Sequence, residues 1–204
     1  GMKMIYPNAV YKQLLYSNLP DNQLLMNSRA KVEDALEWNE NPTYWLKIGH
    51  LLYELIYSDQ YEVDEYLALN KLSDKANRSC LSLSIVEPFV WYRLADGLYI
   101  VDDQDVNILK FLQLSIYTGR IEPNLFLLRL TFLSRYIDVF DDELNGLIKD
   151  QIRLAWNMKK HHFVNTVIGS PALKPLVYDA LSPEDYMDFD QRFDKIFKKN
   201  NPTN

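Results

Sequence analysis

The chain has 204 residues, enough for one ordinary domain with a sizeable hydrophobic core. Its hydrophobic share of 48% and aromatic share of 13% exclude a disordered chain. Six glycines disfavour both a turn-rich β fold and a glycine-rich phosphate loop. The net charge of −6 works against binding nucleic acid or an anionic membrane surface, because both need an excess of lysine and arginine. A basic protein or a small molecule remains as partner.

Cysteine use and hydropathy predict a cytoplasmic, soluble protein. Cys80 is the only cysteine, so no intrachain disulfide forms. The first residues contain no long apolar run typical of a secretory signal. The densest apolar run, Leu125 to Leu133, is interrupted by Arg129 and is too short to span a membrane. Gly1, ahead of Met2, is typical of a residue left by an expression tag.

Helix signals begin early in the chain. A first helix is expected over residues 22–38, and Asn41-Pro42 is a helix start, since asparagine caps exposed amides and proline suits the first turn. The residues after Pro42 that fall on one helical face are Trp45, Ile48, Leu52, Leu55 and Ile56.

Residues 81–86 fit either a helix or a short strand, because Leu81, Leu83 and Ile85 alternate with serines. We favour a helix that runs up to Pro88 and breaks there, since no partner strand is visible in the sequence.

The middle of the chain predicts two helices of different character. After Asp105, apolar residues recur with helical spacing up to Gly119, which is placed to end the helix. Residues 124–140 are apolar on nearly every side, which is typical of a buried helix. We therefore expect a central helix near 124–140.

The last third repeats the same helix-start chemistry. Asp141, Ser170-Pro171 and Ser182-Pro183 each precede an apolar pattern of helical period. The basic run Lys159 to His162 suits the C-terminal end of the helix that starts after Asp141, where positive charge complements the helix dipole.

These signals predict an all-α fold, a compact array of about nine or ten antiparallel helices. Connections are short and no linker of Pro, Gly and Ser is present, so we expect one helical domain over residues 2–199. Residues 200–204 are expected to form a disordered tail.

Four acidic clusters mark the sequence, and most of them begin predicted helices, where carboxylates are favoured by the helix dipole. Together with the net charge they suggest a non-catalytic protein that binds a basic protein partner; a toxin-neutralising immunity-type protein is one concrete version. The residues predicted to contact that partner lie in one stretch: Asp138, Asp141, Asp142 and Glu143.

An alternative function is a small-molecule binding protein or a metal-dependent hydrolase with a pocket between helices. His50 and Glu54 are four residues apart, so their side chains meet on one helical face, and Trp45 and Tyr53 are aromatic neighbours. Two ligands do not complete a metal site, so no metal is predicted.

Signatures of catalysis and of cofactors are missing from the sequence. It contains no GxSxG elbow, no Walker A loop and no dinucleotide fingerprint. Cys80 has no histidine nearby in sequence and is expected to be a buried, inert thiol. We therefore expect no cofactor and favour a binding protein over an enzyme.

Overall fold

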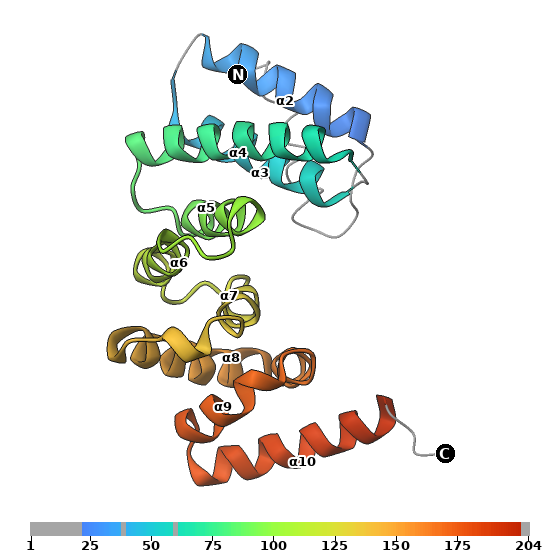
Figure 1. Ribbon diagram of the computed structural model, residues 1–204, viewed down its shortest axis with the longest axis vertical. Coiled ribbons are helices and arrows are strands. Elements are labelled where there is room, and N and C mark those ends of the chain that lie inside the picture. Colours follow the sequence, from blue (N-terminus) through green and yellow to red (C-terminus); the bar gives the residue numbers. More distant parts are fainter. Residues whose placement is uncertain (1–21, 38–39, 59–60, 201–204) are drawn as a thin grey trace. The chain divides into compact units, whose positions relative to one another are not determined.

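A computed structural model describes residues 22–37, 40–58 and 61–200 (Figure 1). Within these ranges the chain forms nine α-helices and two short 3-10 helices and no strand, which confirms the predicted all-α fold. No helix in these ranges combines the length and the apolar character needed to cross a bilayer. Gly1 and, apart from Asn200, the expected tail 200–204 lie outside the described residues.

The chain divides into two compact units, Gly1–Phe111 and Leu112–Asn204, which we call unit 1 and unit 2. Unit 1 has ten Lys and Arg against sixteen Asp and Glu, whereas unit 2 has twelve of each. The net charge of −6 therefore belongs to unit 1. A single domain over residues 2–199 stays a prediction.

Unit 1 contains α2 (Asn22–Leu36), α3 (Pro42–Ser58), α4 (Val63–Leu83), α5 (Pro88–Val101) and the start of α6 (Asn107–Thr118). Helices α3 and α4 lie side by side and α2 packs on α3 (Figure 1). Their shared core consists of Val32, Ile48, Leu51, Leu52, Leu55 and Ala76. A second apolar cluster, of Cys80, Val90 and Leu94, joins α4 to α5.

The predicted helix starts in unit 1 are confirmed in detail at Asn41, whose Oδ1 accepts a hydrogen bond of 2.8 Å from the backbone N–H of Thr43. The helix expected to reach Pro88 is shorter: α4 ends at Leu83, and Ser84 is extended with φ −152° and ψ 102°. Glu87 is also extended, as the residue before a proline must be. The segment between the two helices is therefore neither helix nor strand.

Unit 2 contains the rest of α6, then α7 (Phe126–Leu133), η2 (Ile137–Val139), α8 (Asp142–Gly169), η3 (Pro171–Leu173), α9 (Lys174–Ala180) and α10 (Pro183–Asn200). Its core is aromatic, with the rings of Trp156, Phe163 and Phe189 in mutual contact at centroid distances of 5.9–6.3 Å. These rings fix α10 against the second half of α8.

The helix expected near 124–140 is buried as predicted but is shorter and divided. Phe126, Leu130 and Leu133 of α7 are fully buried. The helix ends because Ser134 Oγ donates to the Thr131 carbonyl at 2.7 Å and the next amides turn back three residues instead of four. The remaining part forms η2.

Helix α8 continues beyond its predicted end. Lys159 has φ −142° and ψ 43°, which kinks the helix without ending it, and the helical pattern resumes to Gly169. The run Lys159 to His162 thus lies inside α8 and not at its C-terminus, because the apolar residues Phe163, Val164 and Val167 extend the buried face beyond the kink.

Candidate functional site

Three helices of unit 1 place polar side chains along the region where they pack together, from buried residues on α4 and α5 to partly buried and exposed ones on α3. In each helix these residues lie three or four positions from another member, so each is on the same face as that member. We call this set the polar seam, and its members are His50, Tyr53, Glu54 and Tyr57 of α3, Asn70, Ser73 and Asn77 of α4, and Arg93 and Asp96 of α5.

Arg93, which is 5% exposed, organises one end of the seam. Its Nε donates to Asn77 Oδ1 at 3.2 Å and its Nη2 donates to the Leu46 carbonyl at 3.5 Å. Asn77 Nδ2 in turn donates to Ser73 Oγ at 3.3 Å. Gly49 makes room for this network, because a Cβ atom there would stand 2.5 Å from Asn77 Oδ1.

Asp96, which is 7% exposed, organises the other end. Its carboxylate accepts a hydrogen bond from the Tyr57 hydroxyl and one from Tyr53. Burial, and then the negative charge of Asp96, raises the pKa of both tyrosines far above the usual range. Both phenols are therefore locked as protonated donors, which suits a structural role.

His50 and Glu54 meet as the sequence predicts, with His50 Nδ1 3.7 Å from Glu54 Oε1. Burial, followed by the nearby positive charge of Arg93, lowers the pKa of His50 to about 3. Burial raises the pKa of Glu54, and Arg93 opposes that shift. A histidine that stays neutral throughout the physiological range is a poor proton shuttle.

The lowered pKa of His50 gives a stability prediction. In the unfolded chain His50 binds a proton near pH 6.5, whereas in the folded chain it does so only near pH 3. The free energy of unfolding therefore falls as the pH falls through this window. We expect the free energy of unfolding to drop by up to about 2 kcal/mol between pH 7.5 and pH 5. Glu54 has the opposite sign, because its raised pKa favours the folded state as pH falls toward its titration range.

Urea unfolding at several pH values measures this dependence, and His50→Gln is the control because glutamine does not titrate. The account predicts a flatter pH profile for His50→Gln than for the wild type above pH 5. Parallel profiles for the two proteins would assign the pH dependence to other groups.

Trp45 of the predicted pocket lines a cavity whose lining includes neither His50 nor Glu54, and Cys80 is a buried thiol. Trp45 Nε1 donates to Glu40 at 3.4 Å, and its ring lines a cavity of about 220 Å³ between α2, α3 and α4. Burial, followed by the charge of Glu87, raises the pKa of Cys80 to about 11, and its Sγ donates to the Pro42 carbonyl at 3.4 Å. A pocket formed by His50, Glu54, Trp45 and Tyr53 stays a prediction.

The predicted contact residues Asp138, Asp141, Asp142 and Glu143 are all exposed on unit 2. Asp141 caps α8, since its Oδ1 accepts from the Leu144 N–H at 2.7 Å. Glu143 accepts a hydrogen bond from the Tyr117 hydroxyl, and Asp138 lies in η2. Helix capping thus explains part of this stretch, and its role in partner binding stays a prediction.

A buried arginine that the sequence shows only as an interruption holds unit 2 together. Arg129 is fully buried; its Nε donates to Ser115 Oγ at 3.1 Å, and Nη1 donates to the Gly119 carbonyl at 3.0 Å and to Gln151 Oε1 at 3.1 Å. Burial lowers its pKa to about 10, against the opposing charge of Glu122, so it stays charged at neutral pH. The bond to Gly119 satisfies a backbone carbonyl at the end of α6.

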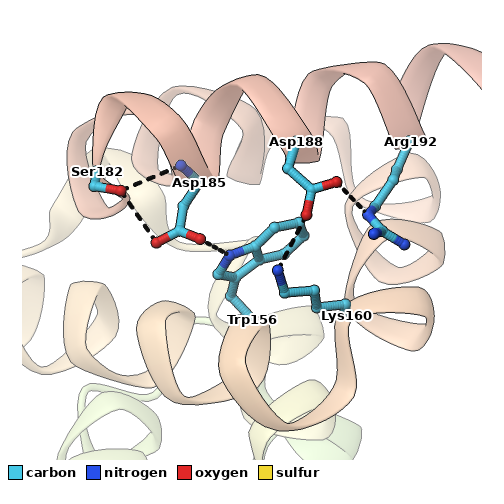
Figure 2. Close-up of polar contacts among 6 residues, drawn as sticks. All are labelled: Trp156, Lys160, Ser182, Asp185, Asp188 and Arg192. Carbon is cyan, nitrogen blue, oxygen red and sulfur yellow. Dashed lines mark hydrogen bonds and ion pairs between the residues drawn. The ribbon is translucent and has the colours of Figure 1, made fainter.

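A polar network joins α8 to α10 (Figure 2). Asp185 accepts from Trp156 Nε1 at 2.7 Å and exchanges hydrogen bonds with Ser182, which caps α10. Lys160 lies 4.2 Å from the centre of the Trp156 ring and 3.0 Å from Asp188. The hydrogen bonds from Trp156 and then Ser182 hold the pKa of the Asp185 carboxyl below its usual value.

Beside this network lies a groove of about 500 Å³ between α8 and α10. The sequence did not predict this groove, because His161 of its α8 wall belongs to the run Lys159 to His162, which was expected at the C-terminal end of a helix. The residues that line the groove are His161, Val164, Asp188, Gln191, Arg192, Lys195, Ile196 and Lys199.

In the part of the chain that the structure describes, no three His, Cys, Asp or Glu side chains cluster closely enough to hold a metal ion. The candidate sites are therefore the polar seam of unit 1, the acidic surfaces and the α8–α10 groove. A comparison of the sequence with known protein families and with curated proteins finds no match.

Proposed function

We propose that this protein is a non-catalytic interaction protein whose acidic unit 1 binds a basic partner protein. The observation that carries the proposal is that unit 1 alone accounts for the whole net charge of −6. Charge concentrated on one unit attracts an oppositely charged partner over long range and speeds the encounter. A toxin-neutralising immunity-type protein remains one version of this function.

The pKa values of His50 and Cys80 support binding over catalysis. Acid–base catalysts work best when their pKa lies near the working pH, and the pKa of His50 at about 3 is far from it. The thiol of Cys80, with its pKa at about 11, is protonated at neutral pH and is therefore a weak nucleophile. Both groups fit a structural role.

Exposed carboxylates on unit 1 provide the surface for such a partner. Asp64 and Glu65 are exposed in the first turn of α4, and Glu33, Asp34 and Glu37 are exposed on or just after α2. Arg29 offsets part of the α2 charge through its ion pair with Glu33 at 2.9 Å. The first turn of α4 is therefore the stronger candidate for contact.

Charge reversal with a matched control tests the proposal. The test variant is Asp64→Lys with Glu65→Lys; the control, Glu184→Lys with Asp194→Lys, makes the same change in net charge at exposed carboxylates of unit 2 outside the predicted contact stretch. Affinity capture from a native lysate at about 50 mM and about 300 mM salt then measures which basic proteins each variant retains.

We expect the wild type to retain a basic protein at low salt and the α4 reversal to reduce its recovery about tenfold. The unit 2 reversal should have a smaller effect. Equal losses for both reversals would contradict a contact on unit 1, and capture that neither reversal nor salt alters would contradict the proposed function.

A further inference from the structure

We propose that the groove between α8 and α10 binds an acidic peptide segment of a partner protein, with carboxylates against the α10 wall and apolar side chains on the floor. The proposal goes beyond the function proposed above, because it uses unit 2 and a ligand of the opposite charge. Its test can fail without affecting the proposal for unit 1.

Cationic side chains form the α10 wall. Arg192, Lys195 and Lys199 are three and four residues apart, so they follow one face of the helix, and all are exposed. Neither Lys195 nor Lys199 forms an ion pair with a carboxylate among the described residues. These two ammonium groups are available to a ligand.

The groove stays positive although it contains one carboxylate. Asp188 is held by Lys160 at 3.0 Å and by Arg192 at 2.6 Å, so its charge is already offset (Figure 2). The kink at Lys159 precedes the two α8 residues that line the groove, His161 and Val164.

The floor is apolar and the rim is polar. Val164 is fully buried beneath the groove, and the half-buried Ile196 presents a hydrocarbon surface at its base. The exposed amide of Gln191 can both donate and accept, which suits a peptide backbone. A ligand that combines negative charge with apolar groups complements this lining.

Spacing favours an extended peptide of alternating character. Residues four apart in a helix rise about 6 Å along its axis, which separates Lys195 from Lys199. Residues two apart in an extended strand are about 6.6 Å apart, and the residue between them points to the opposite side. Acidic side chains can thus meet both lysines while an alternate side chain reaches Ile196.

The size of the groove agrees with a short segment. Its volume of about 500 Å³ lies within the usual range of ligand pockets, roughly 300–1,000 Å³, and is too small for a folded domain. We therefore assign recognition to a few consecutive residues.

Fluorescence anisotropy with the full chain and the labelled peptide Glu-Leu-Glu-Leu-Glu tests the assignment. Lys195→Glu should weaken binding at least about tenfold. Lys198→Glu makes the same change of charge on an exposed lysine outside the groove and should weaken binding less than about threefold. Replacing both leucines of the peptide by serine should weaken binding about tenfold or more, because it removes the contact with the floor.

Three results would overturn the proposal, provided that circular dichroism shows the same helicity in all variants. The first is an equal loss for Lys195→Glu and Lys198→Glu, which indicates a diffuse charge effect. The second is equal binding of the serine peptide, which removes the apolar contact. The third is tighter binding of tripolyphosphate than of the peptide, lost in Lys195→Glu, which would assign the groove to small phosphate compounds.

Discussion

Arg129→Met is expected to lower the free energy of unfolding by about 3 kcal/mol. Methionine keeps much of the buried volume but removes every donor, which leaves the Gly119 carbonyl and Gln151 Oε1 without the hydrogen bonds of 3.0 and 3.1 Å that Arg129 supplies. Burial of the arginine has its own cost, reflected in its lowered pKa, so the net loss is smaller than the sum of the lost bonds.

Chemical unfolding followed by circular dichroism measures this loss. Arg120→Met is the control, because Arg120 is exposed and its ion pair with Asp150 is open to solvent. Arg129→Lys separates charge from geometry, since a lysine retains the charge but lacks the planar fork. We expect Arg129→Lys to be destabilised nearly as much as Arg129→Met. A loss for Arg129→Met no larger than that for Arg120→Met would contradict a structural role for Arg129.

Gly49→Ala is expected to destabilise the protein by about 2 kcal/mol, although alanine is the better helix former. The added Cβ would stand 2.5 Å from Asn77 Oδ1, and Asn77 is buried and bonded to Arg93. Displacing Asn77 would break the bond that Arg93 Nε donates to it.

Gly146→Ala is the matched control, because a Cβ at Gly146 of α8 meets no atom within 4 Å. There the helix propensity of alanine should raise stability by about 0.5–1 kcal/mol. On an Asn77→Ala background, which removes the obstructing group, Gly49→Ala should lose most of its penalty. If Gly49→Ala raised stability as much as Gly146→Ala, Asn77 could move away from the added Cβ without cost, which would contradict the expected destabilisation.

The helix starts were predictable because capping is local. The side chains of Asn41 and Asp141 accept hydrogen bonds from backbone N–H groups two or three residues ahead, so the sequence alone indicates where α3 and α8 begin. Helix ends were less predictable. The end of α7 depends on a serine that bonds back to the helix, and the kink at Lys159 follows no proline or glycine.

The polar seam could have been anticipated only in part. His50 and Glu54 were paired by their spacing in one helix, and they do meet. Arg93 and Asp96 come from α5, and their place beside α3 and α4 depends on packing over long sequence separations. Arg129 appeared as an interruption of an apolar run, and only the fold shows that it is the donor for a helix end.

The α8–α10 groove was hidden for a related reason. Arg192, Lys195 and Lys199 are visible as a basic stripe, and such a stripe is usually a solvated helix face. It lines a groove because α8 continues beyond its kink and supplies the opposite wall, which includes His161.

We propose that the polar seam of unit 1 maintains the fold, while exposed charge performs recognition. The most direct measurement is partner capture by a variant that carries both His50→Gln and Glu54→Gln, with its stability determined in parallel. We expect recovery of the basic partner within about twofold of the wild type, because neither side chain is among the exposed carboxylates proposed to contact the partner. A loss of capture in a variant of unchanged stability and helicity would contradict the claim and would make the polar seam the binding site.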